Sequence, residues 1–242
     1  MRSLLILPCF LAVLLVACGG NSGSKTPTPS AVETSSPEAV QTAEAAVPDP
    51  FASLSSYNYD LKVVADAQIT EIKGSVQAPD RITVDVYDIS TSDQPVESVV
   101  AIGSQYWGRD TSTENQWIVI DATIAEGILS AVQPKDFWSL LPVDQLVGQA
   151  SDLGEENVNG VASHHLQSTS LSADDKSLLA SFFLGVEPGS GTIDIWRADN
   201  GGWLVKAQIS VNFADSEDIS SAGIDWQISN VNSSSVSVQP PL

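Results

Sequence analysis

Cysteine is nearly absent from this chain. Only two of its 242 residues are cysteine, Cys9 and Cys18, so the dense disulfide framework of small secreted domains is excluded. Basic residues are scarce too, because 10 lysines and arginines stand against 30 aspartates and glutamates, giving a net charge of −20. Such a surface repels nucleic acid and anionic lipid headgroups, so neither is an expected partner. We interpret the acidity as a source of solubility.

The N-terminal apolar run is too short to cross a bilayer. It extends over about thirteen residues from Leu4 to Val16, follows Arg2, and is typical of the apolar region of a signal peptide. The run ends in Leu15-Val16-Ala17-Cys18, which resembles the lipobox of bacterial lipoproteins. We therefore expect a signal peptide over residues 1–17 and acylation of Cys18 as the lipid attachment site. The alternative is an ordinary secretory signal with a chance cysteine.

Aromatic residues are missing from the next stretch, Gly19–Pro48, which is rich in Ser, Thr, Pro, Ala and Glu and shows no periodicity. With the lipidated cysteine, residues 18–48 are expected to form a disordered tether, whose root-mean-square reach is roughly 30 Å. Residues 49–242 are enough for one core and predict a single domain. The expected location is outside the cytoplasm, lipid-anchored to the outer face of the cell membrane or to the outer membrane.

Apolar and polar side chains alternate with a period of two through most of residues 49–242. The first run is Tyr57–Val63, and the clearest hairpin joins Thr192–Arg197 to Trp203–Phe213 through a glycine-rich turn. The other expected strands are Ile69–Val76, Arg81–Tyr87, Val96–Ile102, Gln105–Arg109, Gln116–Asp121, Val161–Ser170 and Ile224–Val231. About ten or eleven antiparallel strands predict an α+β fold, mainly β, in which a curved sheet forms a half-open barrel and helices cover its concave face.

Helical spacing interrupts this alternation in two inserts. The first, near Thr123–Gln149, begins with apolar residues at helical spacing and continues from Pro134 into a cluster of large apolar side chains. In the second, Ser172 is the expected N-cap of a helix that runs to Leu184 and stops at Gly185. Asp174 and Asp175 then lie in its first turn, at the positive end of the helix dipole.

Signatures of catalysis and metal binding are missing. The sequence has no G-x-S-x-G elbow, no H-E-x-x-H motif and no phosphate-binding glycine loop. Its two histidines, His164 and His165, are adjacent, and on a strand they would point to opposite faces, so a shared metal ion is not expected. A Ser-His-Asp triad stays open on composition alone. We expect no catalytic residue, no metal and no cofactor, and interpret the chain as a non-enzyme.

Several short motifs in order resemble those of a known group of proteins. After the lipobox and tether come Phe51-x-x-Leu54-x-x-Tyr57, Gly74–Arg81, Gln105-Tyr106-Trp107 with Trp117, Val158–Val161, His164-His165, Ile195-Trp196, Gly202–Lys206 and the tail Val236–Pro240. This order is similar to that of the LolA/LolB-like and LppX/LprG-like envelope lipoproteins, more to the second. The resemblance implies a half-open β-barrel around helices, with an apolar cavity that carries acyl chains.

Large apolar side chains gather in both inserts, and six of them are candidate cavity residues: Phe137, Trp138, Leu141, Leu178, Phe182 and Phe183. The same residue types fill an ordinary core, so the residues leave both interpretations open. Together with the resemblance, they favour a membrane-anchored envelope lipoprotein that binds or transfers a lipid or other hydrophobic small molecule. The alternative is a non-catalytic structural or regulatory module with a filled core, which binds an envelope protein partner.

Overall fold

The computed structural model describes residues 51–110, 114–134, 138, 146, 150–183, 185–214, 216 and 219–241. All of them belong to one compact unit, Pro50–Leu242. Several predictions fall outside the described residues, namely the signal peptide, acylated Cys18, the tether over 18–48, and the candidates Phe137 and Leu141.

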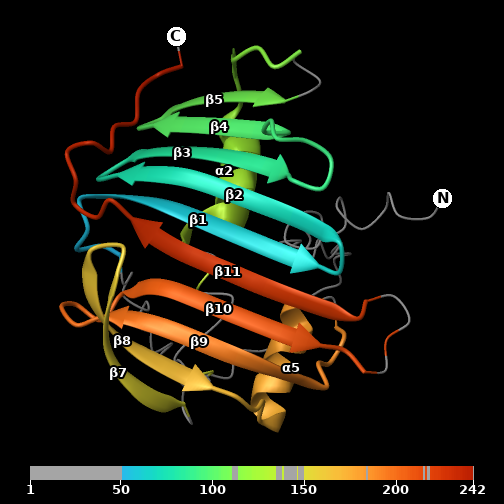
Figure 1. The fold of residues 1–242 in the computed structure, drawn as a ribbon. Coiled ribbons are helices and arrows are strands. Elements are labelled where there is room, and N and C mark those ends of the chain that lie inside the picture. The colour runs from blue at the N-terminus through green and yellow to red at the C-terminus, as the bar shows by residue number, and fades with distance from the viewer. Residues whose placement is uncertain are drawn as a thin grey trace, which may run out of the picture. The chain divides into compact units, whose positions relative to one another are not determined.

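A single sheet of eleven strands dominates the described chain (Figure 1). Its strands are β1 (Ser56–Ala65), β2 (Gln68–Gln77), β3 (Arg81–Asp88), β4 (Glu97–Ile102), β5 (Gln105–Asp110), β6 (Ile118–Val119), β7 (Ser151–Val158), β8 (Val161–Ser168), β9 (Ser190–Ala198), β10 (Leu204–Asn212) and β11 (Ser221–Ser229). The spatial order is β6-β5-β4-β3-β2-β1-β11-β10-β9-β8-β7, and every neighbouring pair is antiparallel.

The first and last strands join the two halves of the sheet. Strand β1 pairs with β11, with Leu61 opposite Trp226 and Tyr59 opposite Ile228. The sheet stays open, because β6 and β7 are its two edges. The prediction of one curved, unclosed antiparallel sheet with helices in two inserts is therefore confirmed.

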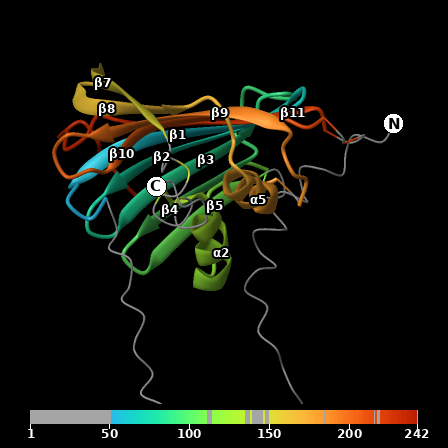
Figure 2. The same ribbon diagram turned by 90° about the horizontal axis from the view of Figure 1, so that it is seen from below.

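Both described helices lie on the same face of the sheet, which we call the concave face (Figure 2). Helix α2 (Ala122–Val132) begins after Asp121, whose carboxylate accepts a hydrogen bond from the Thr123 amide at 2.8 Å. Helix α5 (Ala173–Phe182) begins at a capping box. There Ser172 accepts from the Asp175 amide, and Asp175 accepts from the Ser172 amide. The predicted N-cap is correct.

The concave face is apolar and forms the core. In β10 the side chains of Val205, Ala207, Ile209 and Val211 are at most 1% exposed, whereas the alternate residues are more exposed. Burying one Val or Ile side chain contributes about 1.5–3 kcal/mol. Ala207 lies opposite Trp226, which places β10 and β11 residues on this one face. The period of two in the sequence thus identifies the buried face correctly.

Strand β7 was not expected from the sequence. Its residues Ser151–Val158 are mostly polar and mostly exposed, so they carry no alternation that would predict a strand. Its hairpin with β8 turns through Asn159 and Gly160, both with positive φ. The Asn159 amide group donates to the Ile228 carbonyl oxygen at 2.8 Å. The hairpin tip therefore lies against β11, three strands away from β8 in the sheet order.

Candidate functional site

The first insert contacts the centre of the concave face through Trp138. This side chain is buried, and its indole ring meets that of Trp226 edge-on, with centroids 5.2 Å apart and planes at 83°. Phe51, which precedes β1, belongs to the same cluster, with its ring centroid 5.8 Å from that of Trp226. Edge-to-face aromatic pairs of this kind contribute beyond the area that they bury.

The second insert contacts the sheet through Phe183, which directly follows α5. Phe183 is 2% exposed and lies edge-on to Phe213, with centroids 5.8 Å apart. Phe182 contacts Phe183 but is only half-buried, as is Leu178. The structure therefore places Trp138 and Phe183 in two separate aromatic clusters on the concave face. Leu179 of α5, which is not among the six candidate cavity residues, is fully buried.

Tyr59 brings a polar group into this apolar face. The side chain is 3% exposed, and its hydroxyl has no hydrogen-bond partner among the described residues. Burial, with smaller effects of Tyr57 and Asp85, raises the pKa of Tyr59 well above its ordinary value. A buried hydroxyl without a partner costs about 1–3 kcal/mol. The alternation over Tyr57–Val63 predicts Tyr59 on the apolar face of its strand, and nothing in this pattern signals an unpaired hydroxyl.

A cavity of about 370 Å³ lies on the opposite face of the sheet, the outer face. Two polar rows cross β11, β1, β2 and β3 there: Ser229, Asn58, Ser75 and Thr83 in one, and Gln227, Asp60, Lys73 and Asp85 in the other. Asn159 from the β7–β8 turn also lines the cavity, as do Tyr59 of β1 and Gly74 of β2. Burial, then the charge of Glu71, raises the pKa of Asp60. Such a lining does not suit acyl chains, which need apolar walls.

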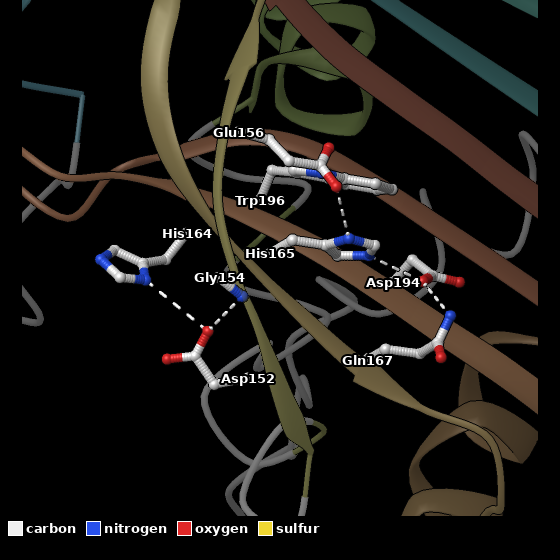
Figure 3. A network of polar contacts seen from close by, with 8 residues as sticks. All are labelled: Asp152, Gly154, Glu156, His164, His165, Gln167, Asp194 and Trp196. Carbon is white, nitrogen blue, oxygen red and sulfur yellow. Dashed lines mark hydrogen bonds and ion pairs between the residues drawn. The ribbon is translucent and has the colours of Figure 1, made fainter.

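The two histidines point away from each other on β8 (Figure 3). His165 stacks on Trp196, with ring centroids 4.1 Å apart. Its Nδ1 lies 3.1 Å from Glu156 and its Nε2 lies 2.8 Å from Asp194. Each ring nitrogen of His165 therefore faces one carboxylate. Trp196 also donates to Glu156 at 2.8 Å, so this network fastens β7 and β8 to β9.

The histidines do not form a nucleophile–base pair within the part of the chain that the structure describes, because their ring nitrogens face carboxylates and no serine. Glu155, His164 and Asp199 each offer one ligand atom, all within 4.8 Å of one another. All three lie at the surface, with the side chain of His164 45% exposed. Exposed acidic groups of this kind are common without an ion, and no role is assigned to them.

Likeness to known proteins is found among solved structures. No protein-family model matches the chain, and no curated protein matches it. Solved structures that it resembles include the lipoprotein LppX of Mycobacterium tuberculosis, at 15% identity and a TM-score of 0.44, with 79% of this chain and 93% of that chain covered. LprF of Mycobacterium bovis is 14% identical at a TM-score of 0.45, with 78% and 90% covered.

A LolA superfamily protein of Nitrosomonas europaea is also similar, at 10% identity and a TM-score of 0.25, with 72% of this chain and 84% of that chain covered. The two groups that the sequence resembles are thus also found among the structures. At these values the likeness leaves function to be argued from the residues of this chain. None of its described helices has the length and hydropathy needed to span a membrane.

Proposed function

We propose that this protein is an exported envelope lipoprotein, anchored by acyl chains on Cys18, which binds or transfers a lipid or other hydrophobic ligand. The ligand lies between the concave face and the helical layer, and the protein performs no catalysis. One observation carries the proposal: both helical inserts contact the same apolar face of the sheet. The first does so through Trp138 and Trp226, and the second through Phe183 and Phe213.

An open sheet suits such a role for a physical reason. The helical inserts contact the concave face through side chains, whereas the sheet is held by its own backbone ladder. The helical layer can therefore shift without breaking strand pairing, and a ligand can replace side-chain contacts with contacts of the same apolar kind. Phe182 and Leu178 are only half-buried, so part of each side chain is available to contact a ligand, which supports their assignment as cavity residues.

A second candidate function has its own support. Phe183 and Leu179 are 2% and 0% exposed, as expected of a filled core. Ile118, Val119 and Ile124 are large apolar side chains that are 47–77% exposed near the β6 edge of the sheet. An interaction module that binds an envelope protein at this edge would account for both observations.

Native mass spectrometry of protein purified from its own host separates the two functions. The carrier function predicts a bound species whose mass matches a lipid and which is recovered by organic extraction. An unliganded mass, together with no binding of a fluorescent acyl compound by delipidated protein, would favour the interaction module.

A further inference from the structure

The cavity on the outer face, about 370 Å³ in volume, falls within the range of about 300–1,000 Å³ that is typical of small-molecule sites. The β7–β8 hairpin lies on the side of the sheet away from the helices (Figure 2). Its tip bounds the cavity at β11, where Asn159 donates to the Ile228 carbonyl oxygen at 2.8 Å and to the Gln227 side chain at 3.2 Å. The hollow is therefore built by two segments that are distant in the chain.

Opposite charges balance around this cavity, although the chain as a whole carries −20. Lys73 lines the cavity and pairs with Glu71, which also lies 3.5 Å from Lys62. Asp85 lines it too and lies 3.8 Å from Arg109. Three carboxylates and three cations gather there: Asp60, Glu71, Asp85, Lys62, Lys73 and Arg109. A region without one dominant charge has no field that would select an anion or a cation.

Several polar groups of the lining have no hydrogen-bond partner within the described part of the chain. Asn58 accepts from Ser75 at 2.9 Å through Oδ1, which leaves its amide N–H groups free. Gln227 accepts from Asn159 through Oε1, which does the same. Asp60 is half-buried, lies directly opposite Gln227 in the register, and accepts no hydrogen bond from the described residues. Free donors and a free acceptor thus lie side by side.

We propose that the outer cavity binds a neutral saccharide, whose hydroxyl groups donate to Asp60 and accept from the amide groups of Asn58 and Gln227. Each sugar hydroxyl has one donor and two acceptor sites, so one ring satisfies both kinds of free group. An anion would approach the unpaired carboxylate of Asp60, and a cation would approach Lys62 and Lys73. An apolar ligand would leave the free groups without partners. This site lies on the opposite face from the proposed carrier function and does not depend on it.

The test titrates glucose, galactose and mannose into the full chain, purified in a detergent that has no sugar headgroup, and follows binding by saturation-transfer NMR. Each hexose is added as the free sugar and as a linear trisaccharide. Tighter binding of a trisaccharide identifies a glycan chain as the source, and equal binding identifies a free sugar. The uronic acid and the amino sugar that correspond to the bound hexose carry one negative and one positive charge, and both should bind more weakly.

Asp60→Asn is expected to weaken binding about tenfold, because a hydroxyl donates more strongly to a carboxylate than to an amide. Gln227→Met keeps the length of its side chain, removes the amide and should also weaken binding. The control is Asp225→Asn, which removes the same charge from the same face outside the lining and should bind like the parent. Burial raises the pKa of Asp60, so Asp60→Asn should unfold at the temperature of the parent or above it.

Two results would overturn the inference and leave the carrier function intact. One is no binding of any neutral sugar by the parent at about 10 mM, where a ligand with a Kd of about 1 mM would be mostly bound. The other is unchanged affinity in both Asp60→Asn and Gln227→Met. Tighter binding of the amino sugar than of the neutral hexose would also contradict it, because the cavity would then be a cation site.

Discussion

Trp138 meets Trp226 edge-on, with 5.2 Å between their ring centroids, although 88 positions separate them in the chain. One comes from the first insert and the other from the last strand. This contact fixes where the first insert touches the sheet. The second insert touches it elsewhere, through Phe183 and Phe213, so each insert can be tested by itself.

Phe182 and Phe183 form a matched pair of neighbours with different burial. Phe183→Ala should lower the free energy of unfolding by about 3–5 kcal/mol, because it empties a fully buried position against Phe213. Phe182→Ala should lower it by clearly less, because Phe182 is half-buried, and should reduce uptake of a fluorescent acyl compound. Denaturant unfolding of delipidated protein measures the first effect and titration the second. A full core-sized loss for Phe182→Ala, with no acyl binding by the parent, would favour the interaction module.

Cys18→Ala should move the protein from the membrane fraction to soluble or unprocessed forms, because the acyl chains would have no attachment point. Fractionation followed by detergent partitioning measures the change, and Cys9→Ala is the control, since that residue precedes the expected cleavage site. A Cys18→Ala protein that still partitions into detergent like the parent would contradict the anchor.

Gly74→Ala should destabilise the sheet by about 1–3 kcal/mol through overpacking, because the new methyl group would overlap the Tyr59 ring. Combining it with Tyr59→Leu should recover part of that loss, since the smaller side chain leaves room for the methyl group. A double-mutant cycle measured by chemical denaturation gives the coupling. Strictly additive losses would show that the ring does not lie over Gly74.

Glu156 should make the attachment of the β7–β8 hairpin depend on pH. The hydrogen bond from Trp196, then that of His165, lowers the pKa of Glu156, and Lys206 adds a smaller effect of the same sign. A carboxyl whose pKa is lowered on folding stabilises the fold above its unfolded pKa, about 4.3, and loses that contribution as the pH falls through the folded value.

Amide hydrogen exchange of β7 should therefore speed up at pH values below about 4, relative to the strands at the centre of the sheet. Glu156→Gln keeps an oxygen that can accept from Trp196 but does not titrate, so it is the matched control. If the parent and this variant respond to acid in the same way, the carboxylate does not hold the hairpin.

Local patterns in the sequence were enough for much of the fold. Tyr59, Leu61 and their alternate neighbours predicted a strand with one buried face, because side chains on a strand alternate whatever it pairs with. Ser172 predicted a helix start for a similar reason, since a capping box closes within four residues. These features depend on contacts near in sequence, which a pattern records directly.

Long-range pairing was decided only in the tertiary structure. Strand β7 could not be predicted from alternation, because it is an exposed edge strand that buries neither face and is mostly polar. It is a strand because it pairs with β8 in the folded sheet. His165 meets Trp196 from a different strand, and Trp138 meets Trp226 from the other end of the domain. The unpaired hydroxyl of Tyr59 is likewise a property of its surroundings. The sequence by itself determined which face of the strands would be buried, and the tertiary structure decided what each buried side chain would touch, because contacts between distant segments depend on strand order and register.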